Sequence, residues 1–93
     1  MEIEFEGKIW FWRGPAPWYF VTVSDEHYEA LKETCERVTY GWGMIPVKAK
    51  VGGTVWETAM FHKDNSYIVP IKASVRKAEN LNEDDIVDVR LEI

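Results

Sequence analysis

Cationic side chains are concentrated in the second half of this 93-residue chain, with Trp42 and Trp56 nearby. Residues 48–77 carry six Lys and Arg against two acids, a net charge of +4, whereas the remainder carries five against fourteen, a net charge of −9. An aromatic ring can stack on a planar ligand, and Lys and Arg can bind a carboxylate or a phosphate. We therefore predict a site for a small anionic ligand. Its candidate residues are Trp42, Lys48, Trp56, Thr58, Lys72 and Arg76.

The same residues also fit a purely structural interpretation. The apolar stems of Lys and Arg commonly lie over exposed rings while their charges stay in water. In that case Trp56 is simply covered on a solvated sheet face, and Trp42 fills one end of a barrel. A protein partner is a further occupant that this face could accept. The overall net charge of −5 argues against binding to nucleic acid or to an anionic membrane.

Residues suited to catalysis or metal binding are few. His27 and His62 have no His, Cys or carboxylate at a metal-ligand spacing such as HxH or HExxH. Cys35 falls on the apolar stripe of a predicted helix, where a thiol usually behaves as a small hydrophobic group. Because no pair of nucleophile and base can be named, we expect no enzymatic activity and no metal or other cofactor.

Alternation of apolar and polar residues with a period of two predicts that most of the chain is β structure. Only residues 25–38 have a helical period, with Tyr28, Leu31, Cys35 and Val38 on one stripe. We expect a single domain over residues 1–93, a small mainly β barrel of six or seven strands with this one helix packed on it. The expected strands are the N-terminal segment up to Trp12, then 18–23, 45–51, 54–61, 67–75 and 86–93.

Two tryptophans interrupt the alternation of the first strand. Trp10 and Trp12 fall on the parity that Glu2, Glu4 and Lys8 otherwise occupy. Either a bulge at the glycine in position 7 shifts the register, or both faces of this half of the strand are covered. We favour covering on both faces.

The registers of two hairpins decide which side chains share a face. We expect a five-residue loop after Phe61, which places Trp56 beside Lys72. At the double glycine of positions 52 and 53 we expect a three-residue loop, which pairs Ala49 with Glu57. In this arrangement Glu57 lies without explanation among apolar neighbours. The core face then includes Val47, Ala49, Val51, Val55, Ala59, Phe61, Tyr67, Val69, Ile71, Ala73 and Val75.

Six motifs follow one another along nearly the whole chain. They are Trp18–Val21; Gly41–Gly43 with Ile45–Val47; Gly52-x-Thr54-x-Trp56-x-Thr58; Tyr67–Ala73; Val75–Ala78; and Asp85-x-Val87-x-Val89. In this order they resemble the bacterial DUF1905 family. The resemblance implies a small double-split β-barrel, an architecture shared with AbrB- and MazE-type transcription factors and antitoxins, and it brings no catalytic residues.

The sequence departs from this family at two turns. Asn80 and Asp84 stand where the family usually has glycine. Both residues tolerate the left-handed backbone conformation, so we expect the turns to be retained. The acidic run Glu83–Asp85 lacks the alternating oxygen ligands of a calcium loop and predicts a turn before the last strand.

Taken together, the sequence favours a soluble, cytoplasmic binding or accessory module for a small anionic ligand or a protein partner. The single cysteine excludes an intrachain disulfide, and no apolar run reaches the ~20 residues of a membrane helix. The alternative is an AbrB- or MazE-like dimeric protein that acts by protein interaction or by binding nucleic acid. That alternative rests on analogy of fold, and the negative net charge counts against it. A homodimer is compatible with either function.

Overall fold

Six strands and two α-helices make up the part of the chain that the computed structural model describes, which is residues 1–15, 17–38, 44–63 and 65–93, without the side chains of residues 35–38. The strands are β1 (Glu2–Trp12), β2 (Trp18–Thr22), β3 (Met44–Val51), β4 (Thr54–Lys63), β5 (Ser66–Ile71) and β6 (Ile86–Glu92). The helices are α1 (Tyr28–Val38), preceded by a 3₁₀ turn at Asp25–His27, and α2 (Ala73–Glu79).

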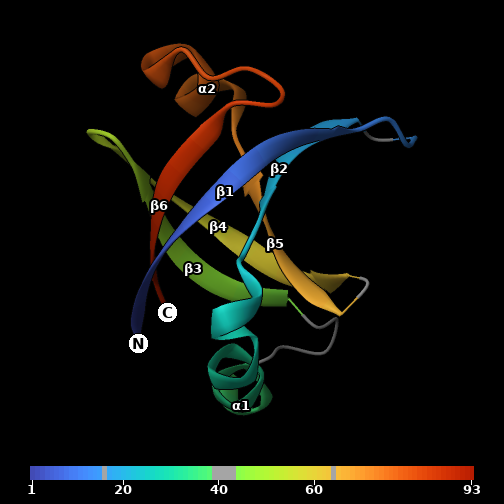
Figure 1. Cartoon of the computed structure of the whole chain (residues 1–93), viewed down its shortest axis with the longest axis vertical. Helices are drawn as coiled ribbons and strands as arrows, with labels where there is room; N and C mark the ends of the chain where they lie inside the picture. Colours follow the sequence, from blue (N-terminus) through green and yellow to red (C-terminus); the bar gives the residue numbers. More distant parts are fainter. Residues whose placement is uncertain (16, 39–43, 64) are drawn as a thin grey trace.

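The strands close into an antiparallel barrel in the order β1-β2-β5-β4-β3-β6. β1 pairs with β6 from Glu2 opposite Glu92 to Lys8 opposite Ile86, so the first and last strands lie side by side (Figure 1). Two seams are short, because β3 pairs with β6 and β4 with β5 over only three residues each. The prediction of a mainly β barrel is confirmed, with six strands.

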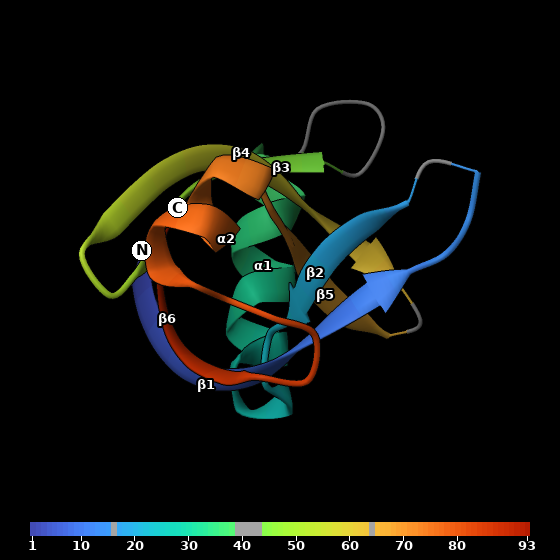
Figure 2. The same ribbon diagram turned by 90° about the horizontal axis from the view of Figure 1, so that it is seen from above.

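The two helices lie at opposite ends of the barrel, α2 over one end and α1 under the other (Figures 1 and 2). Leu31 of α1 is fully buried in the core, and Val75 of α2 is almost fully buried. The helix predicted over 25–38 is confirmed as the 3₁₀ turn followed by α1. Neither helix in the described part of the chain is long and apolar enough to span a membrane.

Alternate residues of every strand point inward and form the core. Its most buried members are Ile9, Leu31, Ile45, Met60, Ile71, Leu91, Val21, Val69 and Val89. Gly7 allows β1 to approach β2 closely, since a Cβ at this position would lie 2.6 Å from Cγ2 of Val21. The pairing of β1 with β6 continues through Gly7 without interruption, so this glycine marks close packing and not a bulge.

A second apolar layer covers the outer face of β1, β2 and β4. This outer aromatic layer consists of Trp10, Trp12, Trp18, Phe20 and Phe61. Phe20 points away from the core and is nevertheless buried, with ring centroids 5.2 Å from Trp10 and 5.6 Å from Phe61. Trp10 Nε1 donates a hydrogen bond of 2.9 Å to Thr22 Oγ1. Covering on both faces is therefore confirmed at Trp10, whereas Trp12, at the end of the strand, is 41% exposed and the prediction is wrong there.

The strand predicted over 67–75 is too long, because β5 ends at Ile71 and residues 73–79 form α2. The backbone at Lys72 is still extended, and the helix begins at the next residue. Asn80 ends the helix in the left-handed conformation, with φ of 53°, and its backbone N–H donates to the carbonyls of Arg76 and Lys77. Ala73 and Val75, assigned to the strand by the sequence, therefore belong to a helix.

Both predicted hairpin registers are wrong by one residue. Val51 pairs with Thr54 and Lys63 with Ser66, which leaves two residues in each connection. Gly52 and Asn65 supply the positive φ that such short connections need, at 59° and 62°. A shift of one residue exchanges the two faces of a strand. On β4 the inward side chains are Trp56 and Met60, and the outward ones include Val55 and Glu57.

Candidate ligand-binding site

Trp56 is a core residue, contrary to its predicted place on an exposed face beside Lys72. Only 5% of the residue is exposed, and it lies opposite Ala49 in the β3–β4 hairpin. Its indole Nε1 donates a hydrogen bond of 3.1 Å to the Pro70 carbonyl. This bond bridges β4 and β5 where the two strands have ceased to pair. The indole thus closes a gap in the barrel wall and offers no surface to a ligand.

Lys48 lies apart from the other predicted cations. It is exposed on β3 directly opposite Glu57, and both residues line an open groove that also contains Glu92. The negative charges of Glu57 and Glu92 outweigh the positive charge of Lys48, so this groove is a poor receptor for an anion. Trp42, the remaining aromatic candidate, lies outside the described residues.

Thr58 and Lys72 do share one surface, as the sequence predicted. They line a groove of about 340 Å³, which we call the Lys72 groove. Its other walls belong to the outer aromatic layer and to β5, and they are Trp18, Phe20, Phe61 and Pro70. The groove lies where β4 and β5 separate. It combines apolar walls with one exposed ammonium group.

Arg76 lies on α2, where its guanidinium covers the ring of Tyr19. The guanidinium carbon is 3.7 Å from the ring centroid, within the range of a cation–π contact. The Nε atom of Arg76 is buried and has no hydrogen-bond partner among the described residues. Most buried polar groups in proteins are satisfied, so this donor requires an explanation.

A second groove, of about 210 Å³, surrounds this guanidinium and is called here the Arg76 groove. Phe11, Pro17, Trp18, Tyr19, Ile71, Ala73 and Arg76 line it. Phe11 and Tyr19 are in contact, with ring centroids 4.7 Å apart. Trp18 lines both grooves and separates them, with Lys72 on one side and Arg76 on the other.

The groove residues that the sequence analysis missed include Trp18, Tyr19 and Phe11. All three belong to the β1–β2 hairpin, which extends beyond the barrel wall (Figures 1 and 2). The signal was present, since Trp12 and Trp18 bracket a turn rich in glycine and proline and lie opposite each other across the hairpin. Both residues are more than two-fifths exposed, which is unusual for such large apolar side chains.

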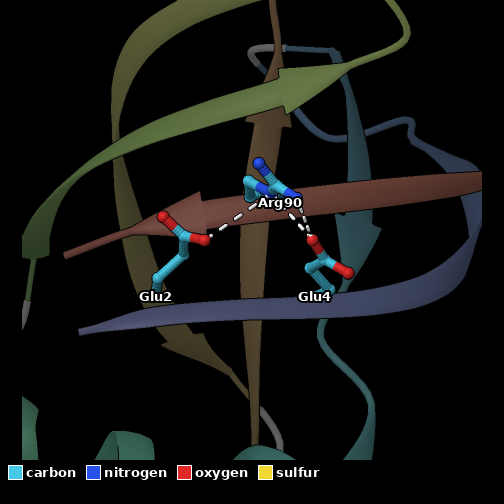
Figure 3. A network of polar contacts seen from close by, with 3 residues as sticks. All are labelled: Glu2, Glu4 and Arg90. Carbon is cyan, nitrogen blue, oxygen red and sulfur yellow. Dashed lines mark hydrogen bonds and ion pairs between the residues drawn. The ribbon is translucent and has the colours of Figure 1, made fainter.

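The strongest polar network outside the grooves joins β1 to β6. Arg90 donates from Nε to Glu4 Oε1 at 2.8 Å and also from Nη2, and Glu2 lies 3.8 Å from Nε (Figure 3). The hydrogen bonds and charge of Glu4, with a smaller attraction from Glu2, raise the pKa of Arg90 above its ordinary value. Because carboxylates already surround this guanidinium, it is not a receptor for a further anion.

A tyrosine and a histidine meet between α1 and β4, a contact that the sequence did not reveal. Tyr28 Oη lies 3.0 Å from His62 Nε2, and both rings pack against Tyr67. The side chain of His27, in the preceding turn, contacts the Glu4 carbonyl at 2.9 Å. These contacts hold the helical segment on the barrel. Across the described residues, no group of three or more His, Cys, Asp or Glu is placed to hold a metal ion.

The fold and its grooves define a small six-stranded β-barrel whose hairpin β1–β2 and helix α2 frame an aromatic, cationic surface. The chain belongs to the DUF1905 family, since the family model, a domain of unknown function, matches residues 5–91. The resemblance seen in the sequence is thereby confirmed. No curated protein matches the chain significantly.

Proposed function

We propose that this protein is a binding module that holds a small anionic ligand in the grooves on either side of Trp18. The observation that carries the proposal is the environment of the Arg76 guanidinium. Its guanidinium is stacked on Tyr19 within an apolar groove, and its buried Nε has no hydrogen-bond partner among the described residues.

An anionic ligand would supply what this donor lacks. A buried donor without a partner costs about 1–3 kcal/mol, and an acceptor on a ligand recovers that energy. A hydrogen bond from a guanidinium to an anion is also stronger than one between neutral groups. Trp18 is 43% exposed and provides a large ring surface for the apolar part of the ligand.

Lys72 adds a second cation to the same region. The described residues offer no carboxylate within ion-pair distance of Lys72 or Arg76, although the chain as a whole is acidic. Both cations therefore attract an incoming anion without first leaving an internal partner. Because Lys72 is exposed, its attraction is long-range and sensitive to salt.

Thermal unfolding and tryptophan fluorescence test this function. Benzoate, inorganic phosphate and adenosine monophosphate are added separately to the protein. A ligand that binds only the native state stabilises it by RT ln(1 + [L]/Kd), about 2.7 kcal/mol at a hundredfold excess over Kd, so at least one probe should raise the melting temperature. Added salt should weaken the response.

A pair of double variants locates the effect. Lys72→Ala with Arg76→Ala should abolish the response and leave the stability of the free protein within about 1 kcal/mol. Lys48→Ala with Lys50→Ala removes the same charge from β3 and should leave the response intact. If neither melting temperature nor fluorescence of the wild type responds to any probe, the proposal is wrong. Equal losses in both double variants would assign the response to overall charge, and not to the grooves.

The exposed indoles favour a second candidate, in which the hairpin contacts another copy of the chain. Trp12 and Trp18 are 41% and 43% exposed and form one cross-strand pair. Exposed apolar patches of this kind commonly mark interaction surfaces. Sedimentation velocity over a range of protein concentrations tests this candidate. A dimer that dissociates on Trp12→Gln substitution supports it, and a monomer at every concentration excludes it.

A further inference from the structure

We infer that the Arg76 groove is specific for an aromatic monocarboxylate, with the ring held by the apolar walls and the carboxylate by Arg76. This inference rests on the proposed binding function and names the chemical class of its ligand. The size of the groove, the geometry of Arg76 and the count of charges each limit the choice.

The size of the groove suits an apolar ligand group of about one ring. An apolar cavity of about 150 Å³ is sufficient to bind benzene. The Arg76 groove has about 210 Å³, which leaves space for one planar substituent beside a six-membered ring. A nucleotide, with a base, a sugar and a phosphate, would extend beyond the groove into solvent. Phe11, Trp18 and Ile71 line the groove and present aromatic and aliphatic surface to such a ring.

The geometry of Arg76 favours a planar acceptor with two oxygens. One face of the guanidinium lies over Tyr19, so further hydrogen bonds must come from its edge. The buried Nε belongs to that edge and has no partner among the described residues. Nε and a neighbouring Nη point in nearly parallel directions, which matches the two oxygens of a carboxylate. Because Nε is buried, the side chains that cover it must shift when the carboxylate binds. A carboxylate held in this way is coplanar with the guanidinium.

The charges around the groove favour a single negative charge. Arg76 is the only charged residue among the described residues that line it. One guanidinium balances one carboxylate, whereas a phosphate dianion would bring a second charge into an apolar site without a partner. Lys72 faces the other groove, across Trp18, and is a hydrated point charge without a planar fork. We therefore assign the ligand contact to Arg76 and only long-range attraction to Lys72.

The experiment is an NMR titration of the wild-type protein with four probes. Benzoate combines the ring and the charge, benzamide has the ring without the charge, acetate has the charge without the ring, and inorganic phosphate carries more charge. Arg76 Nε–H and the ring protons of Tyr19 report on the groove, and the amide of Leu91 in the core reports on the fold. We expect benzoate to shift the groove signals with an affinity at least about tenfold higher than that of any other probe, equivalent to ~1.4 kcal/mol.

Two single variants complete the test. Arg76→Lys keeps the charge and removes the planar fork, so benzoate should bind about tenfold more weakly. Lys72→Gln should change the benzoate affinity less than threefold at physiological salt, since Lys72 acts through screened attraction. If Arg76→Lys disturbs the Leu91 signal, the four-probe comparison on the wild type decides alone.

The outcomes separate this inference from the proposed function. Binding of phosphate or acetate at Arg76 with an affinity equal to that of benzoate would overturn the ligand class and leave the binding function standing. Binding of benzamide equal to that of benzoate would overturn the role of the carboxylate. Absence of any shift at Arg76, Tyr19 or Lys72 with all four probes would overturn both.

Discussion

Gly52 is a residue whose replacement should be costly for two separate reasons. Its φ of +59° lies in the left-handed region, and a Cβ there would collide with Oε1 of Glu79 on α2. Glu79 cannot move away freely, because its Oε2 accepts a hydrogen bond of 2.5 Å from Thr54 Oγ1. Gly52→Ala should therefore lower the free energy of unfolding by about 1–2 kcal/mol from the backbone alone, and by more if the Thr54 bond breaks.

Gly53 provides the matched control for this prediction. Its backbone is not in the left-handed region, and nothing lies within 4 Å of a Cβ placed on it. Gly53→Ala should change the free energy of unfolding by no more than about 0.5 kcal/mol in urea denaturation. Equal effects of the two substitutions would contradict both the left-handed conformation of Gly52 and its contact with Glu79 of α2.

The contrast between Trp56 and Trp12 tests the corrected hairpin register. Trp56→Phe removes the hydrogen bond to the Pro70 carbonyl and leaves a cavity in the core, which together should cost about 2–3 kcal/mol. Trp12→Phe removes the same atoms from a side chain that is 41% exposed and should cost less than about 1 kcal/mol. Chemical denaturation of both variants measures the difference. Similar losses in the free energy of unfolding would instead support the register that places Trp56 at the surface.

At the scale of the element, the sequence predicted where structure forms better than how strands align. Period-two and period-3.6 patterns identified the β segments and the helix over 25–38, because each element buries one face. The register failed on β4, where both faces carry apolar residues and the pattern cannot choose between them. Glu57 was the residue that could have decided. Its place on the supposed core face had no explanation, and it is exposed opposite Lys48.

The candidate site was predicted in the same partial way. Counting charge along the chain identified Lys72 and Arg76, because charge excess is a property of composition. The charge count could not exclude Trp56 or Lys48 from the candidate site, because their separation from Lys72 depends on the strand register and on the short α2 helix. It also could not find Tyr19, because the contact between Tyr19 and Arg76 joins a hairpin to a helix far along the chain.

Helix α2 offers a prediction at the scale of the element, since its end depends on the conformation of one residue. Asn80 has φ of 53°, which confirms the left-handed conformation expected where the family usually has glycine. Asn80→Gly should preserve or slightly raise the melting temperature, because glycine adopts this conformation without steric cost. Asn80→Val should cost at least about 1 kcal/mol, because a β-branched residue is strained there. Differential scanning calorimetry distinguishes the two, and an equally stable Asn80→Val variant would contradict the assigned cap.

At the scale of the whole molecule, closure of the barrel brings the two ends of the described chain together. The Met1 amino group donates to the Ile93 carbonyl at 3.1 Å, and the Ile93 N–H donates to the Met1 carbonyl at 2.8 Å. Both ends also lie side by side in the two views of the fold (Figures 1 and 2). The contact between β1 and β6 therefore closes a loop of nearly the entire chain. The conformational entropy that the chain loses when this loop closes opposes folding.

Joining residue 93 to residue 1 through a short Gly-Ser linker should consequently stabilise the protein. The link removes conformations of the unfolded chain that the folded barrel cannot use, an effect typically of about 2–4 kcal/mol for a covalent cross-link. Urea denaturation should show a higher midpoint together with a smaller m value, since the circular unfolded chain exposes less surface. The control is the linear protein carrying the same linker at one end, which should unfold like the wild type. If the circular protein were no more stable than this control, the contact between β1 and β6 would not determine the free-energy cost of closing the barrel. That cost would then arise at the short strand pairings of β3 with β6 and of β4 with β5.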